Sequence, residues 1–338
     1  MKHLQRSELG TVGYLHRTKI GIGRRFLTPL MVMIAALCLA APGALAYGTK
    51  APKKIPIVMV GDRLVDVAYH LGVVPEVMSV RSSHWPASKE LEMVSDTLMC
   101  PTRTLGDTSL LVETAKKHGI TRVIAESRAG SCSANSTISM VKLEDRLKEH
   151  GMTVEFVDFS EGLEKAVQEI AAVLGVPENA ASVLEEYKKK TAKAEKAMPK
   201  KPLGKKVVVL KGVYSEETGK SFLQVEAPEG YTDRFLLEPL GCENVGNRMF
   251  REGAKESHGY YTLRRLTNLG VANPDVIVMT GDSYAGQKAL KEALARDPEL
   301  RNVPAVRSMA VYSLPAFVNS SALGYPAILY KWIKALEM

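Results

Sequence analysis

Cysteine and tryptophan are scarce in this chain, with four and two among 338 residues, and all aromatic residues together make up 6%. The cysteines form no C-x-x-C pair, which excludes thiolate pairs at the spacing of zinc ribbons or thioredoxin-like redox sites. The sequence also has neither a G-x-S-x-G nor an H-E-x-x-H motif, so no local signature of a hydrolase or zinc protease is present. We therefore predict a protein that is not an enzyme and that needs no cofactor.

The positive charge of the chain is concentrated at its start. The formal net charge is +8, and residues 1–46 contain six lysine or arginine residues against Glu8 alone. Without that segment the charge falls to +3, which gives no argument for a nucleic-acid partner.

One long apolar run occurs, at residues 26–41, and it also lies in this first segment. Arg24 and Arg25 precede it, and Ala44 and Ala46 supply the small residues of a cleavage site, which is the pattern of a secretory signal peptide. A membrane anchor is the alternative, but the run is shorter than the ~20 residues of a spanning helix. We predict a signal peptide over residues 1–46, cleavage after Ala46 and a periplasmic protein.

The exported part would keep Cys100, Cys132 and Cys242. One disulfide plus a free thiol, or three buried thiols, are both compatible with an oxidising compartment.

Residues 55–160 alternate between apolar strands and amphipathic helices, which predicts a parallel doubly wound sheet in an N-terminal α/β lobe. The expected strands are 55–60, 77–80, 121–125 and 153–158, the expected helices are 62–72, 108–118 and 137–150, and residues 81–107 are expected to form a long loop.

Residues 161–200 show no strand pattern and are predicted to form two helices, separated by Gly175 and Pro177. The second helix, 177–198, is charged on most faces, which is typical of a bridge between domains. A second α/β unit follows over residues 203–338, with strands at 206–210, 274–280 and within 306–316, and helices at 233–240, 286–295 and 325–336. The fold class is thus α/β, with two doubly wound α/β lobes joined by one long bridging helix.

The stretch YSEETGKS, residues 214–221, resembles a phosphate-binding loop but fails physically. Tyr214 replaces the first glycine, and the following FLQVEA reads as a strand where the phosphate site requires a helix. We therefore expect no nucleotide site here.

Basic and aromatic residues gather in loops at the ends of predicted strands, where open α/β sheets bind ligands. Such side chains suit a large, flat or anionic ligand, held by stacking and charge-assisted hydrogen bonds. The alternative is that Trp85 and the two adjacent tyrosines only pack the lobe surface. The predicted ligand-binding residues are Arg81, His84, Trp85, Arg103, Arg128, Tyr214, His258, Tyr260 and Tyr261.

Five stretches together resemble a known family: GDRLVDVAYHLGVVPEVMSV, the helices from LEKAVQEIAAVLG to KAEKA, LLEPLGCENVG, ANPDVIVMTG and NVPAVRSMAVYSLP. They are similar to the substrate-binding proteins of iron-siderophore, haem and cobalamin ABC importers, over residues 55–336. The resemblance implies a monomeric, bilobed protein that captures a metal chelate and delivers it to an inner-membrane ABC permease. The alternative is an extracytoplasmic metal- or tetrapyrrole-handling protein on the same scaffold, without a permease partner.

The sequence departs from this family in its docking residues. The resemblance implies one glutamate on each lobe that pairs with arginine on the permease. Glu113 is near the expected place in the first lobe, whereas Arg264 and Arg265 occupy it in the second.

Overall fold

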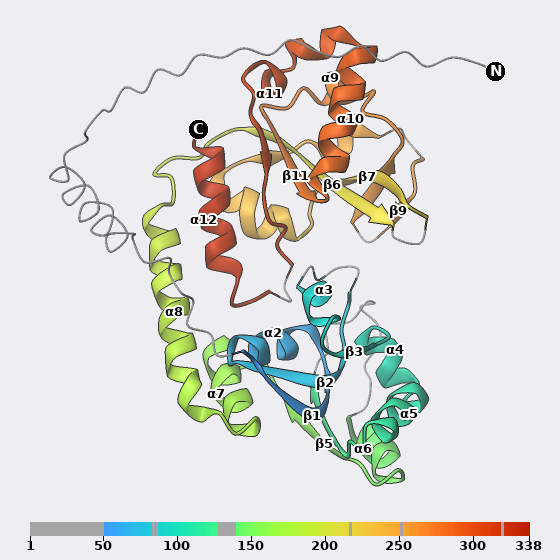
Figure 1. Ribbon diagram of the computed structural model, residues 1–338. Coiled ribbons are helices and arrows are strands. Elements are labelled where there is room, and N and C mark those ends of the chain that lie inside the picture. Colours follow the sequence, from blue (N-terminus) through green and yellow to red (C-terminus); the bar gives the residue numbers. More distant parts are fainter. Residues whose placement is uncertain are drawn as a thin grey trace, which may run out of the picture. The chain divides into compact units, whose positions relative to one another are not determined.

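The computed structural model describes residues 51–82, 85, 87–127, 140–215, 218–250, 253–257, 259–318 and 321–338 (Figure 1). The predicted signal peptide, His84, Arg128, Cys132 and His258 lie outside the described residues.

The first lobe is built on a five-stranded sheet in the order β3-β2-β1-β4-β5, and every neighbouring pair is parallel. Parallel strands need crossover connections, and helices supply them. The strands are β1 (Lys53–Val60), β2 (Val73–Ser79), β3 (Asp96–Leu98), β4 (Arg122–Glu126) and β5 (Thr153–Val157), and the main helices are α2 (Asp62–His70), α5 (Ser109–Lys117), α6 (Met140–Lys148) and α7 (Leu163–Val173).

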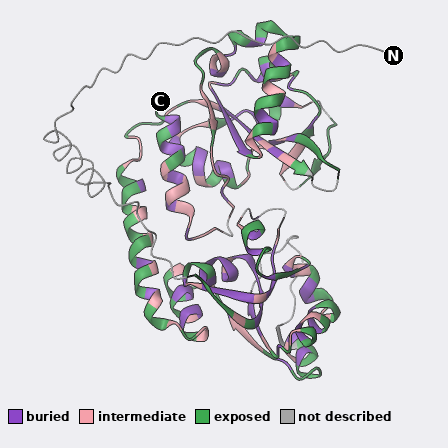
Figure 2. Ribbon diagram, in the orientation of Figure 1, coloured by how far each residue is buried: buried purple, intermediate pink, exposed green. Residues whose placement is uncertain are grey.

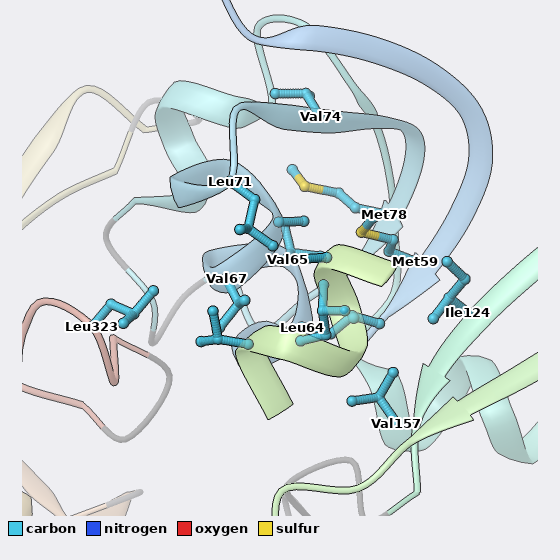
Figure 3. Packing of buried hydrophobic residues seen from close by; sticks show 14 of the residues in the cluster. Met59, Leu64, Val65, Val67, Leu71, Val74, Met78, Ile124, Val157 and Leu323 are labelled. Atoms are coloured by element: carbon cyan, nitrogen blue, oxygen red, sulfur yellow. The ribbon is translucent and has the colours of Figure 1, made fainter. Parts of the chain in front are cut away.

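Helices cover both faces of this sheet because β1 is apolar on both sides. Ile57 and Met59 join a core with α2 and α7, whereas Val58 and Val60 join a second core with α5 and α6. This continuous apolar run is what a strand buried on both faces requires. The purple of buried residues runs along the ribbon of β1 and its helices in Figure 2. Figure 3 shows Met59 and Leu64 packed in the first of these cores.

The prediction of one long loop over residues 81–107 is wrong. The segment contains α3 (Ser88–Leu91), the edge strand β3 and α4 (Pro101–Gly106). Each has six residues or fewer, which is too short to show a helical or strand period in the sequence.

The second lobe has a seven-stranded mixed sheet in the order β12-β11-β6-β7-β10-β9, with β8 also paired to β6. The pairs among β8, β6, β11 and β12 are parallel, and those among β6, β7, β10 and β9 are antiparallel. The strands are β6 (Lys206–Ser215), β7 (Lys220–Glu226), β8 (Glu243–Asn244), β9 (Glu256–Ser257), β10 (Tyr260–Leu263), β11 (Val276–Gly281) and β12 (Val311–Ser313).

Two helical layers also cover this sheet, as the alternation along β6 shows. Val208 and Leu210 join a core with α9 and α10, whereas Val207 and Val209 join one with α12 and the turns after residue 232. The predicted helix at 233–240 is present as a π-helical turn, η1 (Asp233–Leu237), followed by a 3₁₀ turn, η2 (Glu238–Leu240). The other helical elements are η3 (Gly246–Met249), α9 (Leu269–Ala272), α10 (Ser283–Arg296), η4 (Pro298–Asn302), α11 (Pro304–Arg307) and α12 (Tyr325–Leu336).

The long bridging helix is confirmed as α8 (Pro177–Lys196), which runs without interruption for 20 residues. Leu184 packs in the core of the first lobe, and Ala194 packs in a core of the second. Pro177 is at the first turn, where its missing N–H costs no hydrogen bond. The fold class is therefore the predicted one, two α/β lobes joined by a long helix. None of the described helices is long and apolar enough to cross a membrane.

Residues that precede α12 also pack in the first core. Leu323, which lies just before α12, is 4% exposed and packs in the same core as Val67 of α2 (Figure 3). Apolar burial thus holds Val318 and Leu323 to the first lobe.

Candidate functional site

Strands β6, β7 and β10 carry polar side chains on one face of the second sheet. In the antiparallel register, Lys211 lies opposite Gln224, and Glu226 lies opposite Tyr260. Opposed residues share a face, and so do residues two apart along a strand. Lys211, Gln224, Glu226 and Tyr260 therefore lie together, and we call these four residues the polar face.

Glu226 is the most deeply buried member of the polar face, with 6% of its surface exposed. Its Oε2 accepts a hydrogen bond of 2.8 Å from Thr232 Oγ1. Gly230 leaves room for the carboxyl group, because a Cβ at that position would lie 3.0 Å from Glu226 Oε1. Burial raises the pKa of Glu226 to about 7, and the negative charge of Asp233 adds to this, while Thr232 and Lys211 oppose it. A carboxyl group that titrates near neutral pH is thus built into the sheet.

Lys211 and Tyr260 lie on either side of β7 and contact each other. The Lys211 Nζ is 4.8 Å from the centroid of the Tyr260 ring, within the range of a cation–π interaction. Burial lowers the pKa of Lys211, and Glu226 opposes this. The pKa of Tyr260 is raised by burial and by Glu226. Tyr260 therefore stays protonated at physiological pH and can donate a hydrogen bond from its phenol.

The turn that carries Thr232 is fixed by a network of hydrogen bonds. Asp233 accepts from the backbone N–H of Glu229 at 2.6 Å and from Asn244 Nδ2 at 2.9 Å. Asn244 Oδ1 in turn accepts from the backbone N–H of Gly246 at 2.8 Å. Burial raises the pKa of Asp233, and these hydrogen bonds oppose the increase. The network holds Thr232 in position to donate to Glu226.

Aromatic side chains continue from this turn. Phe235 makes edge contacts with Phe317 and Tyr325, with ring centroids 5.0 and 5.9 Å apart, and it is 6.1 Å from Tyr231. The Tyr325 hydroxyl donates to the Phe235 carbonyl at 3.0 Å. Tyr231 is 40% exposed and directly precedes Thr232. A partly exposed aromatic surface therefore adjoins the polar face.

Tyr261 and Tyr214 lie on the opposite face of the sheet from Tyr260, since strand neighbours alternate. The Tyr261 ring stacks on Phe250, with centroids 3.5 Å apart and planes inclined by 18°, and it packs against the core that contains Leu223. Tyr214 is at the end of β6 opposite Ser221, and it is 51% exposed. The structure brings Tyr260 to the polar face and leaves these two outside it.

In the first lobe, Arg81 is held where β1 and β2 end. Its backbone N–H donates to Asp62 Oδ1 at 2.8 Å, and its Nε donates to Asp62 Oδ2. Asp62 is buried at the start of α2. Arg81 therefore lies at the carboxyl edge of the parallel sheet, where it was predicted.

A second arginine–carboxylate pair lies at the same edge, and the sequence did not reveal it. Arg63 Nη2 and Nε donate to Glu126 Oε2 at 2.9 and 3.1 Å, and Glu126 Oε1 accepts the backbone N–H groups of Arg63 and Leu64. The Arg63 guanidinium also lies 4.3 Å from the centroid of the Phe159 ring. Burial raises the pKa of Glu126, and Arg63 opposes the increase. Gly61 permits this pair, because a Cβ there would meet Glu126 at 2.5 Å.

Trp85 follows Arg81 closely in the chain, and its backbone N–H donates to the Arg81 carbonyl oxygen at 2.9 Å. Trp85 is fully buried in the first core, and its Nε1 has no hydrogen-bond partner in the described part of the chain. Arg103 on α4 and Glu113 on α5 are exposed. Cys100 and Cys242 are half-buried free thiols. Across the described ranges, no three His, Cys, Asp or Glu side chains are close enough together to hold a metal ion.

Comparison with known proteins identifies the fold and the family. A family model described as periplasmic binding protein matches residues 137–317, more than half of the chain. A search of curated proteins found no match. Among solved structures, the iron-uptake system-binding protein FeuA from Bacillus subtilis is similar, with 16% identity over 86% of this chain and 96% of that one, and a TM-score of 0.52. The apo form of the periplasmic heme-binding protein RhuT from Roseiflexus sp. RS-1 is 15% identical over 83% and 97% of the two chains, with a TM-score of 0.50.

These similarities confirm the resemblance seen in the sequence. At such identities the solved structures show a shared fold alone, whereas the family model covers β5, the bridging helix and most of the second lobe. The family consists of extracytoplasmic binding proteins, which are not enzymes. This chain belongs to the periplasmic binding protein family.

Proposed function

We propose that this protein captures a metal chelate, such as a siderophore, haem or corrinoid-like molecule, in the periplasm and delivers it to an inner-membrane ABC importer. Two proteins that share its fold are named for iron uptake and for heme binding, which supports this ligand class. The observation that carries the proposal is the polar face beside the aromatic surface around Phe235. A cation, a phenol donor and aromatic rings are groups that a flat, anionic chelate can use.

We expect capture to consist of binding alone, without a catalysed reaction of the ligand. Lys211 would pair with an acidic group of the ligand, Tyr260 would donate a hydrogen bond, and Tyr231 would offer an aromatic surface. The bridging helix α8 has no glycine and has proline only at its first position, so it resists bending. We infer that any closure of the two lobes, for which we propose boundaries at 55–160 and 203–338, is small.

The other predicted contacts belong to the same proposal. Arg81, at the strand edge of the first lobe, would supply a second positive charge to an anionic ligand. His84, Trp85, Arg103, Arg128, Tyr214, His258 and Tyr261 stay predictions, and the packing of Trp85 and Tyr261 favours a structural role for these two. We propose Glu113 as a contact to the permease and a monomeric protein.

Titration of the purified, ligand-free protein tests the ligand class. Haemin and the ferric complex of a hexadentate tris-catecholate siderophore are suitable probes, and binding is followed by quenching of tyrosine and tryptophan fluorescence. We expect one of them to bind with a Kd of about 1 μM or below, which is about 8 kcal/mol of binding free energy. Lys211→Met should weaken that binding, and Lys291→Met, an exposed lysine on α10, is the matched control. Failure of both probes to bind would exclude these two chelate classes.

One observation favours the second candidate function, a chelate-handling protein without a permease. Arg264 and Arg265 are exposed between β10 and α9, where the family resemblance implies a docking glutamate. A reconstituted permease whose ATPase activity rises on addition of the loaded protein would support the importer. An unchanged ATPase rate with every permease encoded nearby would support the alternative.

A further inference from the structure

We propose that Lys211, Glu226 and Tyr260 form one subsite for an oxygen anion of the ligand, such as a carboxylate or catecholate, and that Glu226 takes up a proton from solvent when this anion binds. The subsite deepens the proposed function and rests on it. It would make capture of the ligand stronger in mildly acidic surroundings than in alkaline ones.

The geometry places one buried acid directly beside the two groups that can hold an anion. Glu226 and Tyr260 are opposed residues on adjacent strands, so their side chains leave the sheet on the same face. Lys211 reaches across β7 to within 4.8 Å of the Tyr260 ring centroid. An oxygen anion that pairs with Lys211 and accepts from the Tyr260 hydroxyl would therefore lie close to the Glu226 carboxyl group.

A charged Glu226 would oppose such an anion. Glu226 is almost fully buried, and two like charges at short distance in a poorly solvated site repel strongly. The Thr232 hydroxyl donates to Glu226 Oε2 at 2.8 Å, and the Thr232 backbone N–H is a further donor to the carboxyl group. The protonated form would keep the bond from the Thr232 hydroxyl and add an O–H donor toward the anion, since a protonated carboxyl group is both donor and acceptor. Binding of an anion and binding of a proton therefore favour each other.

The charged groups around Glu226 agree with this assignment. Lys211 of β6 is the positive group that acts on it, Asp233 of η1 adds negative charge, and Tyr260 of β10 stays neutral. Asp233 is itself held by Asn244 of β8 and by the Glu229 backbone. The pKa of Glu226 in the unliganded protein is raised to about 7. The carboxyl group is therefore about half protonated at neutral pH, where an approaching anion can complete the protonation.

The pH dependence of affinity tests the subsite. The Kd values of haemin and of the ferric tris-catecholate complex are measured at pH 6.5 and 8.5 for the natural protein and for Glu226→Gln, which keeps the shape and the acceptor for Thr232. Glu238→Gln, an exposed carboxylate on the neighbouring η2, is the matched control. The natural protein and the control should bind about tenfold more weakly at pH 8.5, because a proton must be supplied to Glu226. Glu226→Gln should show at least threefold less pH dependence than either.

The possible results distinguish failure of the proposed subsite from failure of the proposed function. If a probe binds equally tightly at both pH values, or if Glu226→Gln retains the full pH dependence, the subsite is wrong and the chelate-binding function stands. If neither probe binds, both proposals fall. If Glu226→Gln does not fold, calorimetry of the natural protein at pH 7.5 in two buffers of different ionisation enthalpy decides, since about half a proton or more should be taken up per ligand. Zero uptake overturns the subsite.

Discussion

Tyr260 and Tyr261 are adjacent in the sequence, and we predict that their substitutions have opposite consequences. Tyr261 stacks on Phe250 and packs in the core of the second lobe, whereas Tyr260 lies on the polar face beside Lys211. Replacement of Tyr261 by alanine should therefore lower the free energy of unfolding and leave ligand affinity nearly unchanged. Tyr260→Phe should weaken ligand binding at nearly unchanged stability.

The magnitude for Tyr261 follows from its burial and its stacking. Removal of a fully buried aromatic ring costs about 3–5 kcal/mol, and a half-buried ring should lose about half of that. Loss of the stacked pair with Phe250 adds about 0.5–1.5 kcal/mol. We therefore expect a destabilisation of roughly 2–4 kcal/mol for Tyr261→Ala.

Tyr260→Phe keeps the ring beside Lys211 and removes only the hydroxyl group, so we expect a change in stability below about 1 kcal/mol and a loss of affinity of about 1 kcal/mol. Urea unfolding followed by circular dichroism measures the stability of both variants, and fluorescence titration measures their affinity. A stable Tyr261→Ala protein with weakened ligand binding would refute the assignment of the two faces.

The pKa of Glu226 is about 7 in the folded protein and 4.5 ordinarily, so its stabilising contribution is full below pH 4.5 and is lost as the pH rises through 7. Between pH 5 and 8, the free energy of unfolding of the natural protein, measured with urea, should fall by about 2–3 kcal/mol relative to that of Glu226→Gln. Equal pH profiles for the two proteins would contradict this. Leu323→Ala should cost about 2–4 kcal/mol because Leu323 is buried in the first core, whereas Leu110→Ala at an exposed position should cost little; thermal unfolding of the two variants compares them. A Gly-Gly insertion after Tyr187 should interrupt α8 and increase the radius of gyration in X-ray scattering while each lobe stays folded, and an unchanged radius and affinity would refute the bridging role. N-terminal sequencing of the exported protein should begin at Tyr47, and an uncleaved cytoplasmic chain would contradict the predicted signal peptide.

The sequence predicted the elements that are long enough to show a helical or strand period. The first parallel sheet, the helix that begins at Pro177 and the closing helix at residues 325–336 were all expected, and the strand over FLQVEA was identified within β7. The two ends of the stretch that resembles a phosphate-binding loop belong to the antiparallel pair of β6 and β7, since Tyr214 and Ser215 of β6 pair with Ser221 and Lys220 of β7. Strand β6 was expected to end at residue 210 because its apolar run stops there, where Lys211 and Gly212 follow.

The polar face was only partly visible in the sequence. Tyr260 was expected in a site, but Glu226 was not, because a single glutamate at the end of an apolar strand is usually a solvated residue. Its burial depends on Thr232, Gly230 and the register with Tyr260, which are contacts between segments that periodicity does not report. The pairs of Arg63 with Glu126 and of Arg81 with Asp62 were hidden for the same reason. In physical terms, the sequence indicates which edge of a sheet is polar, and the tertiary contacts decide which of those side chains are buried.

Native mass spectrometry of the protein isolated from the cells that express it tests the central claim, capture of a metal chelate, most directly. We predict one metal-containing small molecule per chain, carried by a monomer, and a strongly reduced bound fraction in Lys211→Met with the Lys291→Met control unchanged. A bound solute that contains no metal, or a metal chelate retained equally by Lys211→Met, would contradict the account.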